Sequence, residues 1–112
     1  MSQVTSHVLD TAKGKPAKDV EVQLFSVEGE RTRNIATGIT NKDGRIAELL
    51  PQEQILPRGL YKLIFDTRKY FESIGEPVFY PVVEIHFTID DDSHYHIPLL
   101  LSPFGYSTYR GS

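Results

Sequence analysis

Apolar and polar residues alternate with a period of two along several short segments, and this pattern constrains the fold more than any other feature. Successive side chains of a β-strand point to opposite faces, so alternation of this kind predicts a half-buried strand. In one such segment, Val83, Ile85, Phe87 and Ile89 make a single face apolar. The segments with this pattern are 4–10, 20–24, 60–65 and 82–90, with a weaker example at 33–40.

Turn-forming residues separate these segments at short intervals. Glu28-Gly29-Glu30 is typical of a hairpin, and Asp43-Gly44 supplies residues that tolerate positive φ. Residues 12–16 and 57–59 contain Gly and Pro and predict further turns. Directly after Gly44 we expect another short strand, from Arg45 to Leu50.

Only segment 67–74 has the helical pattern instead. Asp66 or Thr67 can cap its N-terminus, Gly75 suits the position after its last residue, and Pro77 blocks continuation. Its apolar stripe consists of Tyr70, Phe71 and Ile74. About eight short strands with one short helix are typical of an all-β, two-sheet antiparallel sandwich. At 112 residues, we expect a single domain over 1–112.

The C-terminal segment carries unusual chemistry for a chain end. His94 and His96 are two residues apart on a predicted strand, so both face the same side. His7 likewise lies opposite the apolar residues of the first strand. The opposite face of the C-terminal strand is apolar enough to belong to the core, with Tyr95, Ile97, Leu99 and Leu101. Tyrosines and an arginine follow near the last residue, so we expect this tail to be docked.

Composition excludes several classes of function. The net charge of −3 argues against nucleic-acid and anionic-membrane partners, which usually require a basic surface. The absence of cysteine excludes disulfides, thiolate metal sites and a Cys nucleophile. No apolar run approaches the ~20 residues that cross a bilayer. The first residues lack the pattern of a signal peptide, so we expect a cytoplasmic location.

The histidines admit several interpretations. Each one could be an ordinary surface residue, and we interpret His86 as structural. His94 and His96 could also form a metal pair with Asp91, Asp92 or His86, but no recognised metal spacing is present, so we predict no metal. Nucleophile-elbow, phosphate-loop and dinucleotide motifs are absent from the sequence. An enzyme built from these residues would most economically use histidine as a general base and arginine for charge stabilisation, without a cofactor.

Three blocks of sequence carry a specific likeness. They are His7-Val8-Leu9-Asp10-Thr11 with Gly14-Lys15-Pro16-Ala17 behind it, Asp43-Gly44-Arg45, and His96 to Pro103 with the terminal Tyr109-Arg110-Gly111-Ser112. Together they resemble the 5-hydroxyisourate hydrolases, the enzymatic branch of the transthyretin family. The likeness spans almost the whole chain, and the terminal tetrapeptide is its most specific part.

The resemblance implies a fold, an assembly and a reaction. Members form eight-stranded sandwiches that assemble as homotetramers, each a dimer of dimers, around a channel lined by the first and the last two strands. They hydrolyse 5-hydroxyisourate, a small molecule formed by urate oxidation, at an amide-like C–N bond of its six-membered ring. The product is an intermediate in urate degradation to allantoin.

The resemblance also implies roles for individual residues. His7 and His96 match the base and proton-shuttling pair, and Arg45 matches a group that stabilises negative charge. Which histidine is the base stays open, and His94 is a rival for the role of His96. The predicted catalytic residues are His7, Arg45, His96 and Ser112; the predicted substrate-binding residues are these four with Tyr109 and Arg110.

Two other functions remain open for a chain of this pattern. A transthyretin-like carrier would bind small aromatic ligands in the tetramer channel. In that branch, however, the positions of His7 and His96 are not histidines, and the terminal Tyr-Arg-Gly-Ser is missing. A structural or adhesive sandwich would leave the histidines and the aromatic tail unexplained. The enzyme is therefore the favoured reading.

Overall fold

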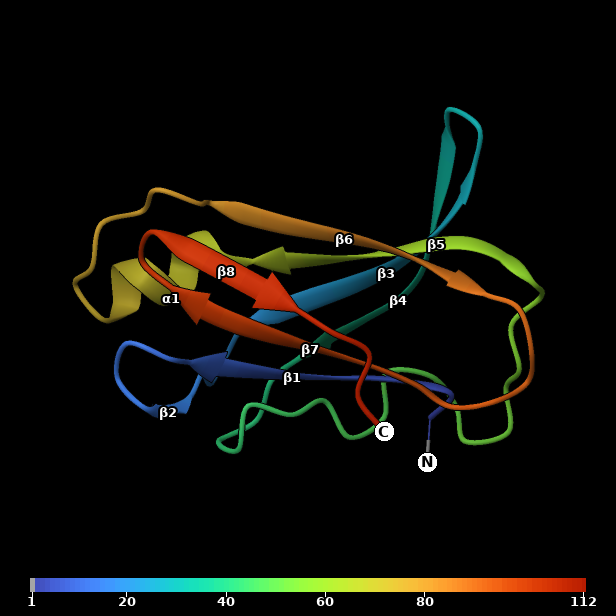
Figure 1. Cartoon of the computed structure of the whole chain (residues 1–112), viewed down its shortest axis with the longest axis horizontal. Coiled ribbons are helices and arrows are strands. Elements are labelled where there is room, and N and C mark those ends of the chain that lie inside the picture. The colour runs from blue at the N-terminus through green and yellow to red at the C-terminus, as the bar shows by residue number, and fades with distance from the viewer. Residues whose placement is uncertain (1) are drawn as a thin grey trace.

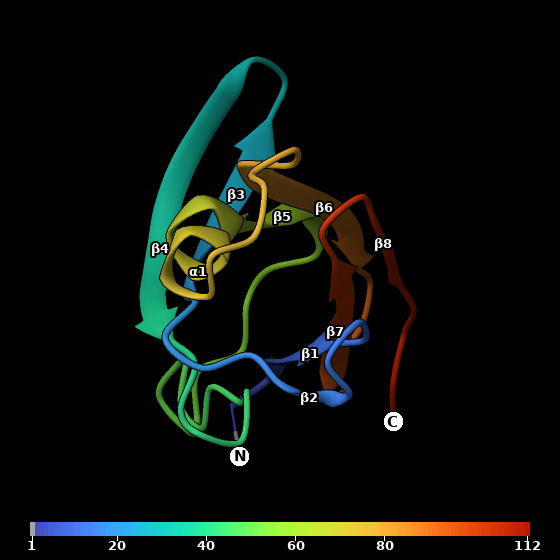
Figure 2. The same ribbon diagram turned by 90° about the vertical axis from the view of Figure 1, so that its left-hand side faces the viewer.

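Two four-stranded sheets pack face to face, with one short helix at one end (Figures 1 and 2). The structure is a computed structural model and describes residues 2–112. The strand orders are β2-β1-β7-β8 and β4-β3-β5-β6. This architecture confirms the predicted sandwich of eight strands and one helix. Within the described residues, no helix has the length and apolarity that crossing a membrane requires.

The elements follow the alternating segments closely. Their bounds are β1 Val4–Asp10, β2 Lys15–Pro16, β3 Glu21–Glu28, β4 Arg31–Ile39, β5 Gly59–Asp66, α1 Thr67–Ser73, β6 Val82–Ile89, β7 Tyr95–Ser102 and β8 Gly105–Thr108. The hairpin of β3 and β4 projects beyond the body of the sandwich (Figure 1).

Three details differ from the sequence predictions. Strand β1 pairs with β7 in parallel, whereas the other pairs are antiparallel. The predicted strand from Arg45 to Leu50 was wrong: only Arg45 pairs, as a single bridge to His7, and Leu50 turns inward to the core. Lys15–Pro16, predicted as part of a turn, forms the short strand β2.

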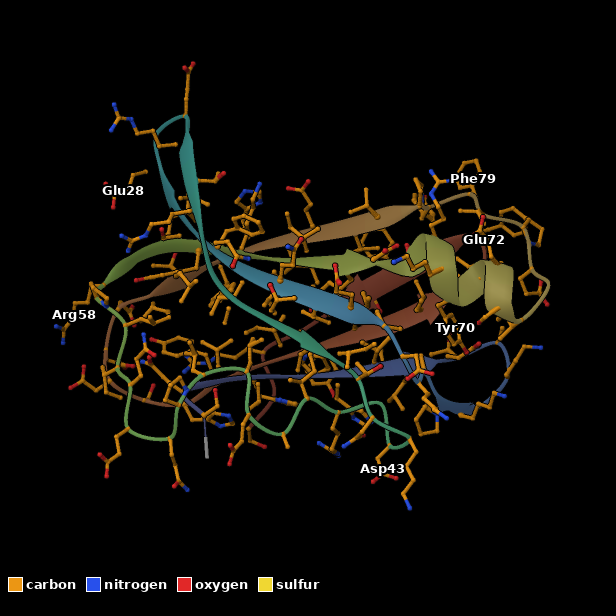
Figure 3. All side chains as sticks on the ribbon, turned by 180° about the vertical axis from the view of Figure 1, so that it is seen from behind. Glu28, Asp43, Arg58, Tyr70, Glu72 and Phe79 are labelled. Carbon is orange, nitrogen blue, oxygen red and sulfur yellow. The ribbon has the colours of Figure 1, made fainter. Side chains whose placement is uncertain are left out.

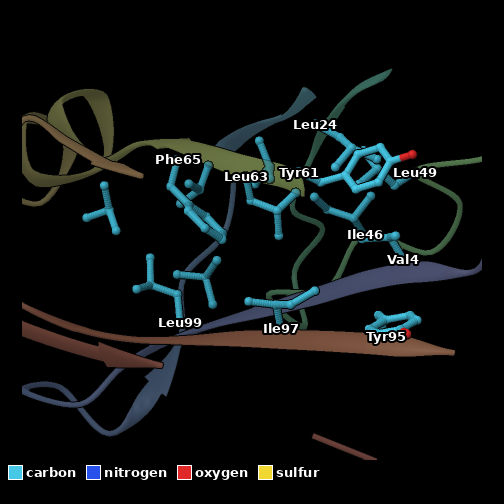
Figure 4. Close-up of a cluster of buried hydrophobic side chains, with 14 of the residues drawn as sticks. Val4, Leu24, Ile46, Leu49, Tyr61, Leu63, Phe65, Tyr95, Ile97 and Leu99 are labelled. Atoms are coloured by element: carbon cyan, nitrogen blue, oxygen red, sulfur yellow. The ribbon is translucent and has the colours of Figure 1, made fainter. Parts of the chain in front are cut away.

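The core lies between the sheets and is made by the apolar faces of the strands (Figure 4). The prediction that the apolar face of β7 is buried is confirmed, and the histidine face lies on the outside of the same sheet. Burying one leucine, valine or phenylalanine side chain contributes about 1.5–3 kcal/mol to the stability of the fold. On the edge strand β6, Val83 and Ile89 are buried, whereas Ile85 and Phe87 are only half-buried.

Helix α1 begins after Asp66, whose side chain makes no capping hydrogen bond, and ends as predicted at a glycine. Gly75 has φ of 71° and donates from its backbone N–H to the carbonyl of Glu72 (3.2 Å). The N–H of Glu76 donates to the carbonyl of Phe71 (3.0 Å). These two bonds are those of a Schellman motif, in which glycine adopts the left-handed conformation without the cost of a Cβ.

A buried carboxylate fastens the helix to the strand that carries His7. Asp10 is only 3% exposed and ends β1. It accepts hydrogen bonds from the Tyr70 hydroxyl (2.6 Å) and from the backbone N–H of Lys13 (2.9 Å). Figure 3 shows Tyr70 on the side of the helix that faces β1. Burial, together with the bond to Asp10, raises the pKa of the Tyr70 phenol, so it stays a donor.

We predict that Tyr70→Phe lowers the free energy of unfolding by about 1–3 kcal/mol, because Asp10 then loses a donor while it stays buried. Urea unfolding followed by circular dichroism measures the change. Tyr80→Phe is the matched control, since it keeps the edge-on ring contacts with Phe79 and Tyr106. Equal stabilities of Tyr70→Phe and the unsubstituted protein would contradict the anchoring role.

Candidate active site

A shallow cavity of about 290 Å³ lies on the outer face of the sheet that contains β1 and β7. The parallel register of these strands places Thr5 beside His96 and His7 beside Pro98. Polar side chains from four separate parts of the chain line the cavity, among them Thr5, Asn41, Arg45, His94, His96 and Ser112. The fold therefore brings Arg45, His96 and Ser112 together at this cavity. His7 is not among the lining residues, and it is joined to the site by a backbone bridge to Arg45.

The turn 41–44 fixes the ring of His7. His7 Nε2 lies 2.9 Å from the carbonyl oxygen of Asp43. A carbonyl can only accept, so Nε2 carries the proton, and in the neutral ring Nδ1 is the basic nitrogen. Gly44 has φ of 73°, and a Cβ there would clash with the carbonyl of Val8 and lie 3.2 Å from the His7 ring. Glycine thus allows the turn to lie directly on β1.

The same turn presents Arg45. The side-chain oxygen of Asn41 accepts hydrogen bonds from the backbone N–H groups of Asp43 (2.9 Å) and Arg45 (3.1 Å). The carbonyl of Gly44 accepts from the N–H of Val8 (2.8 Å). A side chain that bonds to nearby backbone in this way is a common device for rigidifying a turn. The exposed guanidinium of Arg45 consequently starts from a fixed backbone beside His7.

One hydroxyl joins the two histidines of the C-terminal strand. Thr5 Oγ1 lies 2.7 Å from His94 Nε2 and 2.7 Å from His96 Nδ1. The two imidazole rings are nearly parallel, with centroids 6.1 Å apart. Sequence reasoning did not single out Thr5, although its position two residues before His7 on the same face of β1 was visible.

The C-terminal tail returns to β7 and is docked there. The backbone N–H of Gly111 donates to the carbonyl of His96 (2.8 Å). A Cβ on Gly111 would lie 2.6 Å from Cδ2 of the His96 ring, so only glycine lets the backbone pass so close. This contact carries Ser112 into the cavity lining.

Tyr109 and Arg110 lie outside this cavity. Both line a separate hollow between the edges of β6 and β8. The Arg110 guanidinium stacks 4.2 Å from the centroid of the Tyr95 ring, and its Nη2 donates to Ser93 Oγ (3.2 Å) and to the carbonyl of His94 (3.3 Å). In the single chain, Arg110 therefore holds the segment that presents His94.

Burial and the guanidinium of Arg45 lower the pKa values of His7 and His96. Partial burial, and then the Arg45 guanidinium, lower the pKa of His7 below its ordinary value. Burial lowers the pKa of His96, with further contributions from His94, Arg45 and His7. Both imidazoles are thus free to accept a proton at neutral pH, next to a permanent cation.

Hydrogen-bonding groups, rather than a cluster of metal ligands, surround the histidine pair. Within residues 2–112, no three His, Asp or Glu side chains converge as a metal-binding group. The hydroxyl of Thr5 contacts one ring nitrogen of His94 and one of His96. An arrangement of neutral imidazoles, a guanidinium and a hydroxyl is suited to moving protons and to stabilising negative charge.

The chain is similar to known enzymes along nearly its whole length. It is 47% identical over 115 residues to 5-hydroxyisourate hydrolase 2 of Rhizobium meliloti, covering 98% of this chain and 96% of the relative. Among solved structures, 5-hydroxyisourate hydrolase of Klebsiella pneumoniae matches with a TM-score of 0.84 and 39% identity, covering 97% of this chain and 98% of the other.

A transthyretin and a longer protein share the fold. Sea bream transthyretin, solved in complex with thyroxine, matches with a TM-score of 0.89 and 34% identity, covering 97% of this chain and 94% of the other. The structure of (S)-allantoin synthase matches with a TM-score of 0.88 and 36% identity; it covers 99% of this chain, which spans only 44% of that protein. The sequence pattern of the HIUase/Transthyretin family matches residues 4–111, so the chain belongs to this family.

Proposed function

We propose that this protein hydrolyses 5-hydroxyisourate, opening its six-membered ring at the amide-like C–N bond during urate degradation to allantoin. The observation that carries the proposal is the meeting of His96, Arg45 and Ser112 at one cavity, with His7 paired to Arg45 through the backbone. The relatives named above for this hydrolase support it. We expect no cofactor, because the imidazoles can transfer the protons and Arg45 can stabilise the developing charge.

We assign the chemistry to the histidine pair and Arg45. One imidazole accepts a proton from water as the water oxygen bonds to the ring carbonyl carbon. The guanidinium of Arg45 stabilises the negative charge that develops on the carbonyl oxygen. The C–N bond then breaks, and the leaving nitrogen takes a proton from an imidazole. Ser112, which lines the cavity, would orient the substrate or a histidine through its hydroxyl.

Tyr109 and Arg110 stay predicted substrate-binding residues. In the single chain they lie beside the edges of β6 and β8. Arg110 donates hydrogen bonds to Ser93 and to the carbonyl of His94. A direct contact with substrate would require an arrangement in which these edges meet the cavity of a neighbouring subunit.

The proposed assembly is a homotetramer, a dimer of dimers. Edge strands β6 and β8 come together on one side of the molecule (Figure 2). An aromatic cluster near them is largely exposed: Phe79 is 61%, Phe104 66% and Tyr106 44% accessible. Exposed aromatic clusters of this kind favour a partner surface. A second copy stacked on the outer face of β1 and β7 would also close the open cavity.

We keep the cytoplasm as the expected location.

A carrier of small aromatic ligands is the alternative function. The likeness to a transthyretin that was solved with thyroxine favours it. Against this function, the side chains of Arg45, His94 and His96 place hydrogen-bonding groups in the lining of the cavity. Hydrogen-bonding groups of this type lose water without compensation when an apolar ring covers them.

We predict that the protein accelerates the decay of freshly generated 5-hydroxyisourate, followed by its ultraviolet absorbance. His7→Asn, His96→Asn and Arg45→Gln should each lower kcat/KM by about 10²–10⁴, because each removes a proton-transfer group or a charge-stabilising group. Arg31→Gln, at the start of β4 in the projecting hairpin, is the matched control. Unsubstituted protein that leaves the spontaneous rate unchanged would turn the assignment towards the carrier.

We predict that Arg45→Gln raises the pKa of both His7 and His96. The guanidinium disfavours their protonated forms, so its removal shifts both pKa values upward, while burial keeps holding them down. Titration of the imidazole Cε1–H signals by NMR measures the shift. Arg31→Gln, at the start of β4 in the projecting hairpin, should leave both titrations in place. A decrease in either pKa value would contradict the proposed proximity of the Arg45 guanidinium to the two imidazoles.

We predict that light scattering after gel filtration gives about four times the 12.7 kDa mass of the chain. Phe79→Asp should yield a smaller species, because it places a charge in the exposed aromatic cluster (Figure 3). Lys18→Asp, at an exposed position elsewhere, is the control for the change of charge. A wild-type monomer would contradict the assembly.

A further inference from the structure

The hydroxyl of Thr5 stands between two imidazoles at equal distances. His94 Nε2 and His96 Nδ1 each lie 2.7 Å from Thr5 Oγ1, which is the length of a good hydrogen bond. Thr5 belongs to β1 and His96 to β7, whereas His94 is the residue just before β7. Thr5 is 89 residues from His94 and 91 residues from His96 in the chain, so distant segments meet at this one oxygen.

Counting protons restricts how this contact can be made. A threonine hydroxyl has one proton to donate and can accept from another group. To satisfy both bonds with neutral rings, it donates to one imidazole nitrogen and accepts an N–H from the other. His94 faces it with Nε2 and His96 with Nδ1, so both neutral rings must carry their proton on the same kind of nitrogen. Either both are Nδ1–H or both are Nε2–H.

The protein holds all three groups in place. The parallel register sets Thr5 directly beside His96. Arg110 bonds to the carbonyl of His94 and stacks on the ring of Tyr95, which fixes the backbone from which His94 projects. The Nδ1 atom of His96 is occupied by Thr5, which leaves Nε2 as the ring nitrogen for a substrate in the cavity that His96 lines.

We propose that Thr5 is a positioning residue that relays a proton between His94 and His96, and thereby lets His96 act first as base and then as acid. The inference rests on the proposed hydrolysis and adds two participants, Thr5 and His94, to it. His94 serves as the store for the proton, and His96 remains the group that touches the substrate.

The relay balances at each step. His96 Nε2 takes a proton from the attacking water while its Nδ1 proton moves to Thr5 Oγ1. The original Thr5 proton moves to His94 Nε2, so the positive charge rests on His94. When the C–N bond breaks, His96 Nε2–H protonates the leaving nitrogen while His96 Nδ1 takes a proton from Thr5 Oγ1 and Thr5 takes one from His94 Nε2. His96 therefore stays neutral throughout, and the starting state is restored.

Kinetics of variants at Thr5 provide the first test. Thr5→Val keeps the shape of the side chain but removes the hydroxyl, and it should lower kcat about 10-fold to 100-fold with KM changed less than about threefold. Thr5→Ser restores the hydroxyl and should recover kcat to within about threefold. Thr32→Val, on the projecting hairpin, is the matched control. Equal kcat for Thr5→Val and the unsubstituted protein would overturn the relay, as would a Thr5→Ser variant as slow as Thr5→Val.

The tautomers provide a second test, which needs no substrate. Long-range ¹H–¹⁵N correlation spectra of the intact protein report which ring nitrogen of each neutral histidine is protonated. The relay starts with both rings in the Nδ1–H tautomer, so we expect His94 and His96 both to be protonated on Nδ1, and we expect Thr5→Val to abolish this match. Opposite tautomers in the unsubstituted protein, or a pair protonated on Nε2, would overturn the proposal.

The two tests separate the relay from the hydrolysis on which it builds. A protein without hydrolase activity but with matched tautomers would contradict the proposed function alone, whereas an active enzyme with opposite tautomers would contradict the relay alone. Should Thr5→Val fail to fold, His94→Gln interrupts the relay at its other end and should lower kcat by a similar factor.

Discussion

The parallel pairing of β1 with β7 is the interaction on which the site depends. It joins the first strand to the next-to-last one, and its register sets the chemistry of both faces of the sheet at once. On the inner face, Val8 lies beside Leu99 in the core. On the outer face, Thr5 lies beside His96. A slip of one residue would turn the valines outward and the polar groups inward, so the burial of apolar side chains also enforces the geometry of the site.

Two glycines complete what the strands begin. Gly44 lets the turn 41–44 rest on β1 beside the His7 ring, and Gly111 lets the tail pass over the ring of His96. In both places the backbone, rather than a side chain, packs against the imidazole. Packing of this kind restricts the ring while leaving one nitrogen available, which is what a group that exchanges protons requires. The terminal Tyr-Arg-Gly-Ser thus has a physical reason to contain glycine at its third position.

Local sequence patterns predicted most of the strands and the helix. Contacts between distant segments could not be predicted from these patterns. Alternation predicted the buried face of β7, and Gly75 marked the end of the helix, because both are set by neighbouring residues. The parallel pairing was missed, since no local signal records which distant strand becomes a neighbour. The segment after Arg45 failed as a strand for the same reason: Leu50 is drawn into the core by tertiary packing. Thr5 looked unremarkable alone and acquires a role only beside β7.

The outer face of the sheet that contains β1 and β7 lies away from the core between the sheets. Its residues can change without disturbing the packing between the sheets, so the face records function rather than fold. Here it carries two histidines that share one hydroxyl, with a guanidinium near by. Electrostatic interactions and hydrogen bonds of such groups become stronger where water is excluded. The cavity of a single chain is open, so covering it with a second copy would strengthen each of these interactions. Assembly would then be part of the catalytic apparatus.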